Sequence, residues 1–351
     1  MMSVTLPRAT TFFIGLWLMV DVYLTVDTEC SMGGAWTNPG FEPVAPERAI
    51  LGKIGGEYYG TPRLMDILEE SGLRATFFIE VLAAHVVPES QLTQAYGEIV
   101  SRGHDAQLHL HPVYHFYHLF RQGRINREQL PPNMDLIGRH PLQVQIELLQ
   151  EGCELFRKFT GKSPVAFRAG CYGGSSSTLT ALEKVGIGYD SSFNASHLGG
   201  NCSINGRGPT NGPWRVGAVW EVPVTNFETG FWKTRGLKPL DIGAVSLAEM
   251  RRVLEQAEER QMSPVVFIMH SFTLFKRADV QFRHLKPDRL VIRRFRELCR
   301  FLGKNSDRFR VRTFGEQPQF AAGHQTQFPR VGSLLPACRK FVQGVNRLVW
   351  L

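Results

Sequence analysis

Two carboxylates, Asp27 and Glu29, are separated by a single residue at the end of an apolar, β-branched run over residues 22–26. Side chains two apart on an extended chain point to the same side. In parallel α/β proteins, groups at the carboxyl ends of strands line the ligand site. A strand that ends in this way would deliver two acids to one site, although solvated acids in the following turn would give the same pattern.

Two histidines, His109 and His111, end another apolar run in the sequence QLHLHP. Together with Asp27 or Glu29 they would form a set of two histidines and one carboxylate. Such a set suits Zn²⁺ with one position left for water or substrate, and it also suits Fe²⁺, Co²⁺ or Ni²⁺. His115 lies four residues after His111, so either of these two could be the second histidine ligand. Histidines that merely form hydrogen bonds in the loop are the simpler alternative.

Two further predicted strands end in residues suited to acid–base chemistry. His270 follows an apolar run over residues 264–269, and its ordinary pKa of about 6.5 would let it donate a proton near neutral pH. Arg168 ends a short strand before a glycine-containing turn. Its planar guanidinium could orient Asp27 through a bidentate pair. A core histidine and a surface arginine would explain the two residues equally simply.

The elements that must position these residues alternate between strand and helix. Helices are predicted over residues 61–71, 88–102, 143–160, 177–185, 246–260 and 289–302, and strands over 22–26, 75–80, 104–110, 164–167, 188–193, 221–224, 264–270 and 309–313. This alternation predicts an α/β fold whose parallel sheet closes into a barrel or nearly so. An open doubly wound sheet is the alternative, but the first strand carries no GxGxxG turn.

The predicted barrel occupies most of the chain. We expect residues 1–20 to form a leader or an extra strand and residues 21–315 to form the barrel. Two insertions without clear periodicity interrupt it, at 112–140 and 194–245. Residues 316–351 become polar and then basic and apolar again, which predicts a loosely attached C-terminal tail.

Composition limits the partners and the compartment. The net charge is +8 over 351 residues, but no basic stripe with interleaved aromatic residues occurs, so no nucleic-acid partner is expected. The six cysteines are widely spaced without a CxxC pair, which favours a reducing compartment. The apolar run at residues 11–20 is shorter than the roughly 20 residues that span a bilayer, and no cleavage site follows it. We therefore expect no transmembrane span and a cytoplasmic location, with export as the alternative.

Several segments together resemble the polysaccharide deacetylase family, the NodB-homology carbohydrate esterases. They are TVDTE, GHDAQLHLHP, FRAGCYG, EVPV and FIMHSF, in that family's order and at its intervals, over roughly residues 22–315. The resemblance implies a distorted (β/α)7 barrel. It also implies metal-dependent removal of an N- or O-acetyl group from an acetylated polysaccharide or glycan.

The resemblance also implies a metal-ligand set. The family's second acid, usually adjacent to the first, is replaced by Thr28, so its metal-binding role passes to Glu29. His109 occupies the place of the first histidine ligand, whereas Val113 stands where the second is usual. We favour His111 over His115 as its replacement, with Zn²⁺ as the expected ion.

Catalytic roles follow from the same resemblance. It implies that Asp27 is the general base, that His270 is the general acid and that Arg168 orients Asp27. Tyr172 stands one place later than usual, and backbone N–H groups around Cys171 and Tyr172 would bind the oxyanion. In addition, three tryptophans could stack on sugar rings, although each is also a candidate for simple packing: Trp36, Trp214 and Trp220.

Two other functions are compatible with these residues. Some proteins with NodB-like barrels hydrolyse small cyclic amides or imides, and such a protein could act without a metal. A catalytically silent carbohydrate-binding protein could also keep the fold, and the altered first and second motifs favour this third hypothesis.

Overall fold

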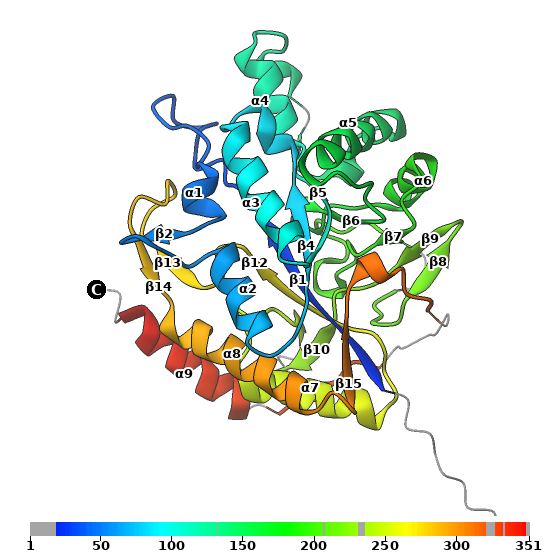
Figure 1. Ribbon diagram of the computed structural model, residues 1–351. Coiled ribbons are helices and arrows are strands. Elements are labelled where there is room, and N and C mark those ends of the chain that lie inside the picture. Colours follow the sequence, from blue (N-terminus) through cyan, green and yellow to red (C-terminus); the bar gives the residue numbers. More distant parts are fainter. Residues whose placement is uncertain are drawn as a thin grey trace, which may run out of the picture.

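The computed structural model describes residues 19–130, 132–205, 208–230, 236–320, 327–332 and 334–348. The predicted leader therefore lies almost entirely outside the described residues. The described chain forms a strongly curled sheet with helices around its outer side (Figure 1).

The central sheet is almost entirely parallel. Within the described residues it has nine strands, with the order β12-β1-β4-β5-β6-β7-β9-β8 and with β15 paired to β1. Only the β8–β9 pair is antiparallel. The strands are β1 (Val20–Thr28), β4 (Thr76–Glu80), β5 (Asp105–Leu110), β6 (Ala166–Ala169), β7 (Tyr189–Asp190), β8 (Trp214–Val216), β9 (Val219–Glu221), β12 (Val265–His270) and β15 (Phe309–Arg312).

Strand β1 is the centre of this sheet because three strands pair with it. Val22 to Asp27 pair with Val265 to His270 of β12 on one side. On the other side, the first half of β1 pairs with β15 and the second half with β4. Its β-branched, apolar sequence suits a strand that is buried on both faces.

Alternation along the strands separates two apolar layers. On β1, the outward residues Val22, Leu24 and Val26 join the large core under the helices, whereas Tyr23 faces the inside of the curl. The inside is filled by a second buried cluster, Tyr23, Phe78, Ala166, Tyr189, Val222, Val266 and Phe314. Because side chains alternate with a period of two, Thr25 and Asp27 also point inward.

In the described part of the chain, six helices cover the outer face, each in contact with the next in the order α7, α8, α2, α3, α5, α6 (Figure 1). They are α2 (Thr61–Glu69), α3 (Glu89–Ser101), α5 (Leu142–Thr160), α6 (Ser176–Val185), α7 (Leu247–Glu259) and α8 (Arg289–Lys304). Their ends follow local chemistry: the Ser246 side chain caps α7, and Gly161 ends α5 in the left-handed conformation.

The sheet curls into an incomplete barrel. After β9 the chain continues past β7, where the Val222 N–H donates to the Asp190 carbonyl. It then reaches β12, where the Thr225 N–H donates to the Val266 carbonyl and the Val266 N–H to Thr225 Oγ1. The two edges thus meet through isolated hydrogen bonds and not through a continuous ladder. The predicted α/β class and distorted barrel are confirmed in this form.

Two stretches expected to be irregular contain regular structure. The segment at 112–140 holds helix α4 (Val113–Arg121), in which Tyr114 and Tyr117 are buried three residues apart. The segment at 194–245 holds the β8–β9 hairpin, so the strand expected at 221–224 begins at Val219. These two predictions were wrong because short aromatic and hairpin patterns give little periodicity.

Smaller elements complete the fold. They are α1 (Pro46–Ala49), β2 (Lys53–Ile54), β3 (Glu57–Tyr58), β10 (Asn226–Thr229), β11 (Gly236–Pro239), β13 (Phe275–Arg277), β14 (Leu285–Pro287), β16 (Arg330–Val331) and α9 (Leu334–Leu348), with single 3₁₀ turns at 82–85, 127–129, 137–139, 170–172, 195–197 and 314–316. In the stretch expected to be a loose tail, β16 pairs with β10, and α9 contacts α7 through an Arg339–Glu249 ion pair of 3.0 Å.

Within the described ranges, no helix has the length and apolar character that crossing a bilayer requires. All six cysteines lie in those ranges, and each is a free thiol.

Near the amino end of β5, His104 should make stability depend on pH. Its Nδ1 accepts a hydrogen bond from the Ala75 N–H, and its Nε2 faces Glu69 Oε1 at 3.2 Å. Burial lowers the pKa of His104 to about 4, against the hydrogen bond to Glu69, which raises it. Between about pH 6.5 and pH 4 the unfolded chain would bind a proton here that the folded chain does not. The free energy of unfolding should therefore decrease by on the order of 3 kcal/mol as the pH is lowered through this range.

The His104→Gln variant should remove most of this pH dependence, because an amide does not titrate. Urea unfolding of both proteins at several pH values across that window measures the effect. Equal slopes of unfolding free energy against pH in the two proteins would contradict the assignment.

Candidate active site

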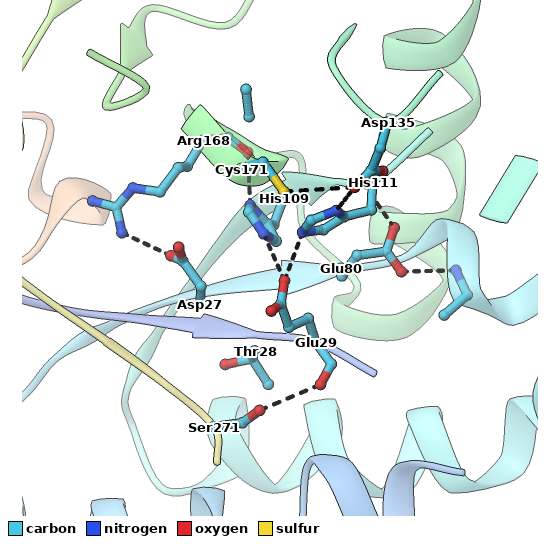
Figure 2. Close-up of polar contacts among 12 residues, drawn as sticks. Asp27, Thr28, Glu29, Glu80, His109, His111, Asp135, Arg168, Cys171 and Ser271 are labelled. Carbon is cyan, nitrogen blue, oxygen red and sulfur yellow. Dashed lines mark hydrogen bonds and ion pairs between the residues drawn. The ribbon is translucent and has the colours of Figure 1, made fainter. Parts of the chain in front are cut away.

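The candidate site lies at the carboxyl ends of β1, β5, β6 and β12, on the inner face of the curl. Asp27 and Glu29 come from β1 and the residue after it, and His109 and His111 from β5 and its end (Figure 2). The two pairs converge because each has the two-residue spacing that keeps side chains on one face.

Three ligand atoms meet at one point. His111 Nε2 lies 2.6 Å and His109 Nε2 3.3 Å from Glu29 Oε2. This group of His, His and carboxylate has the separations that one metal ion requires. The backbone of Glu29 is also fixed, because the Ser271 hydroxyl donates to its carbonyl at 3.3 Å.

The orientation of His109 suits metal binding. Its Nδ1 lies 2.7 Å from the carbonyl oxygen of Arg168. A carbonyl can only accept, so Nδ1 must carry the proton, and the lone pair of neutral His109 is at Nε2. That lone pair faces the Glu29 carboxylate, and two acceptors in contact require a proton or a cation between them.

His111 is held in the same way by Asp135, a residue that the sequence analysis missed. Its Nδ1 lies 2.8 Å from Asp135 Oδ2, which leaves Nε2 for Glu29. Burial alone would lower the pKa of His111, but the charges of Asp135 and Glu29 raise it well above its usual value. The two carboxylates therefore favour positive charge at this point of the site.

The electrostatics of the carboxylates agree with this arrangement. Burial would raise the pKa of the Glu29 carboxyl, but the charge of His111 and the hydrogen bond from it hold that pKa well below its usual range. The pKa of Asp135 is lowered in the same manner, mainly by His111. Glu29, His109 and His111 thus fit a divalent cation, with Asp135 as the outer support of one imidazole.

The structure separates His115 from this group. His115 is on α4, and its Nδ1 lies 2.9 Å from Glu151 Oε2, while His85 binds the other carboxylate oxygen at 2.7 Å. Of the two histidines left open by the sequence, His111 is therefore the one that the fold brings to Glu29.

Glu80, at the end of β4, supports the site from below. It is fully buried, and its carboxyl oxygens accept hydrogen bonds from the backbone N–H groups of Leu82, Ala83 and His111. Burial raises the pKa of Glu80 to about 8. It fixes the backbone of His111 and is not one of the converging ligands.

Arg168 holds Asp27 inside the barrel. The guanidinium is fully buried, and its Nη1 lies 2.7 Å from Asp27 Oδ1 and 2.8 Å from Thr25 Oγ1. Its other N–H groups donate to the carbonyl and hydroxyl of Ser191, and its carbon lies 4.3 Å from the ring centre of Phe78. The pair with Asp27 is a single charge-assisted hydrogen bond and not the bidentate pair that was expected, because the other N–H groups are taken by Ser191.

A buried acid pair lies behind Arg168 and was not anticipated. Asp190 and Glu221 are register partners on β7 and β9, and both are fully buried. Burial raises the pKa of each carboxyl, and the neighbouring acid raises that of Glu221 further, so the pair retains a proton. Asp190 accepts from Ser192, whose oxygen in turn accepts from the Ala169 N–H beside Arg168.

His270 stands opposite Asp27. The two residues are register partners on neighbouring parallel strands, which lie about 4.8 Å apart, and both belong to the inward series of their strands. The imidazole is half-buried and stacks on Phe272, with ring centres 5.0 Å apart and planes at 21°. The fold thus places an acid and an imidazole on the same face beside the three ligand atoms.

The turn after β6 has an unusual backbone. Cys171 and Tyr172 have positive φ angles of 54° and 57°, which are uncommon for residues with a side chain. Gly170 is required beside them, because a Cβ there would lie 2.6 Å from the His111 ring. The Cys171 sulfur lies 3.6 Å from Asp135 Oδ2, and desolvation raises the pKa of the thiol to about 11.

A cavity of about 330 Å³ adjoins two of the three ligands, Glu29 and His111. Its lining includes Trp36, whereas Trp214 is buried against Phe193 and Trp220 packs on Phe320. Of the three tryptophans considered for sugar stacking, the structure brings Trp36 to the site. The full lining is Glu29, Cys30, Ser31, Met32, Trp36, His111, Val113, Tyr114 and Asp135.

Comparison with known proteins yields a likeness in fold. No protein-family model and no curated protein matches the chain. Among solved structures, a Mycobacterium smegmatis protein described as a polysaccharide deacetylase aligns with a TM-score of 0.51 and 18% identity, over 85% of this chain and 88% of that one. This likeness confirms the fold that the resemblance in sequence motifs implied.

Two other solved structures align at TM-scores below 0.5, which by themselves define no shared fold. A family 4 carbohydrate esterase from Streptomyces lividans gives a TM-score of 0.43 with 12% identity, over 87% of this chain and 98% of that one. The Bc1960 peptidoglycan N-acetylglucosamine deacetylase gives 0.40 with 14% identity, over 88% and 92%.

Replacement of Asp135 by Asn should weaken metal binding about 10–100-fold, because the His111 imidazole loses its carboxylate partner. Competition with a chromophoric chelator for Zn²⁺ measures the affinity. Glu151→Gln is the matched control, since it removes the carboxylate that binds His115 and should leave the affinity within about threefold of that of the unmodified protein. Equal Zn²⁺ affinity in Asp135→Asn and the unmodified protein would contradict this role.

Proposed function

We propose that this protein is a metal-dependent hydrolase that removes acetyl groups from an N- or O-acetylated glycan. The observation that supports this most strongly is the convergence of Glu29, His109 and His111 on one point beside an arginine-held aspartate. The fold shared with the Mycobacterium smegmatis protein adds support.

The proposed cofactor is a divalent cation, with Zn²⁺ preferred because two imidazoles and one carboxylate suit it. Glu29 Oε2, His109 Nε2 and His111 Nε2 would hold the ion. When bound, it would supply Lewis-acid activation of water and of the acetyl carbonyl.

The residues of the chain would divide the remaining work. Asp27, oriented by Arg168, would accept a proton from the attacking water. The backbone N–H groups of Cys171 and Tyr172 would donate to the oxyanion that develops on the acetyl carbonyl. His270 would then give a proton to the leaving amine or alcohol.

Two features of the site favour this function over the other two hypotheses. Hydrolysis of a cyclic amide without a metal would give the three converging ligand atoms no role in the reaction. A silent binding protein would have no need of the Asp27 and Arg168 pair, which places a charged guanidinium inside the barrel at a desolvation cost. A cytoplasmic location remains a prediction from the cysteine pattern.

Acetate release is the test that separates these functions. Metal-stripped and Zn²⁺-reloaded protein would be offered acetylated fragments of peptidoglycan, lipopolysaccharide and exopolysaccharide. We expect release that depends on added metal. Release that is independent of metal would favour the cyclic-amide class, and binding without any release would favour the silent carbohydrate-binding protein.

The Asp27→Asn variant should lose acetate release by about 10²–10⁴-fold, since an amide cannot act as the general base. Its affinity for Zn²⁺ should change little, because Asp27 is not among the three converging ligands. Asp21→Asn, the same change at the opposite end of β1, is the matched control and should retain activity. Full activity of Asp27→Asn would contradict the proposed mechanism.

A further inference from the structure

A cation stands beside the site without an acidic partner. Arg277 ends β13, and its guanidinium carbon lies 4.9 Å from the ring centre of Phe272 and 4.6 Å from that of Phe282. The residue is exposed, and no carboxylate of the described chain forms an ion pair with it. A cation held over aromatic rings in this way keeps its N–H groups available as hydrogen-bond donors to other groups.

The position of Arg277 is linked directly to the proposed general acid. The Phe272 ring stacks on the His270 ring, with ring centres 5.0 Å apart. The centre of the same Phe272 ring lies 4.9 Å from the guanidinium carbon of Arg277. The Phe272 ring thus contacts both the imidazole and the guanidinium. Partial burial of the Arg277 side chain lowers its pKa, and the negative charge of Glu29 opposes this change.

The loop that carries Phe282 is built to hold this arrangement. Phe282 is buried with a positive φ of 54°, an uncommon and costly conformation for a bulky residue. The Asp279 carboxylate accepts from the backbone N–H groups of Gln281 and Arg283 and so fixes the turn. Gln281 Nε2 donates to the Gly33 carbonyl at 2.6 Å, which ties the turn to the loop that also carries Trp36.

We propose that Arg277 binds a carboxylate on the glycan, so that the substrate is an acidic acetylated glycan and not a neutral one. This inference rests on the proposed function of the same site. A planar guanidinium matches a carboxylate through two parallel hydrogen bonds, and the stacked rings hold it in place before the substrate arrives. Arg277 is separated from His270 by the Phe272 ring. A carboxylate bound there would belong to the sugar that carries the acetyl group or to the adjacent sugar.

The test compares one oligosaccharide in two charge states. The probe is a peptide-free peptidoglycan tetrasaccharide, which carries lactyl carboxylates, and its reference is the methyl ester of the same molecule. We expect the unmodified protein to favour the acid in kcat/KM, and Arg277→Gln to reduce the acid-to-ester ratio about tenfold. Arg277→Lys should keep part of the preference, because it retains the charge without the planar fork.

Arg283→Gln is the matched control. Arg283 belongs to the same turn, and its guanidinium lies 5.5 Å from the Phe41 ring, so the variant loses the same charge and a similar ring contact. Its acid-to-ester ratio should equal that of the unmodified protein. The inference is overturned if the unmodified protein has no preference for the acid, or if Arg277→Gln and Arg283→Gln change the ratio equally.

Failure of the proposed function would give a different result. If no acetylated substrate is turned over, calorimetric binding of the acid and the ester to the Zn²⁺-loaded protein replaces the kinetic ratio. Loss of preferential acid binding in Arg277→Gln would then support the carboxylate subsite even though deacetylation had failed. Equal binding of both probes to all variants would overturn the subsite as well.

Discussion

One buried guanidinium joins the interior of the barrel to the chemistry at its mouth. Arg168 lies among strands far apart in sequence, with Asp27 and Thr25 on one side and Ser191 on the other. Leaving such a charge unpaired inside a protein costs several kcal/mol, so β1, β6 and the segment after β7 must keep their relative positions. The backbone of the same residue orients His109 through its carbonyl. A single residue thereby fixes both the proposed base and one proposed ligand.

Polarity inside the curl changes along the strand direction. Toward the amino ends the inner face is apolar, with Tyr23, Phe78 and Val266 in one buried cluster. Toward the carboxyl ends the inner positions become Asp27, His109 and Arg168, each hydrogen-bonded. The apolar part excludes water from below, so the polar groups have only one another, the protein backbone and the open end of the barrel as partners.

Local patterns account for the part of the site that could be predicted from the sequence. Asp27 and Glu29, like His109 and His111, are two apart at strand ends, and alternation alone places each pair on one face. Asp135 could not be predicted in this way, because its loop has no period and reaches His111 only through the tertiary fold. The acids Asp190 and Glu221 were missed for a related reason, since their pairing depends on the register of two very short strands.

The same reasoning explains which parts of the fold were anticipated. Long amphipathic helices such as α5 and apolar strands such as β12 repeat their pattern often enough to be recognised. Helix α4 and the β8–β9 hairpin were not, because an aromatic helix of nine residues and strands of three offer few repeats. Closure of the sheet through Thr225 is likewise a long-range contact that no local pattern indicates.

The support of His111 by Asp135 has an evolutionary consequence. The ligands themselves lie in strands or directly after them, and the side chains of those strands also pack the barrel, so changes there disturb the whole molecule. Asp135 instead belongs to the connection between α4 and α5, and its Oδ1 also accepts from Val113, the first residue of α4. Insertions, deletions or substitutions in that connection could therefore change the affinity for the ion during evolution without altering the strands of the barrel.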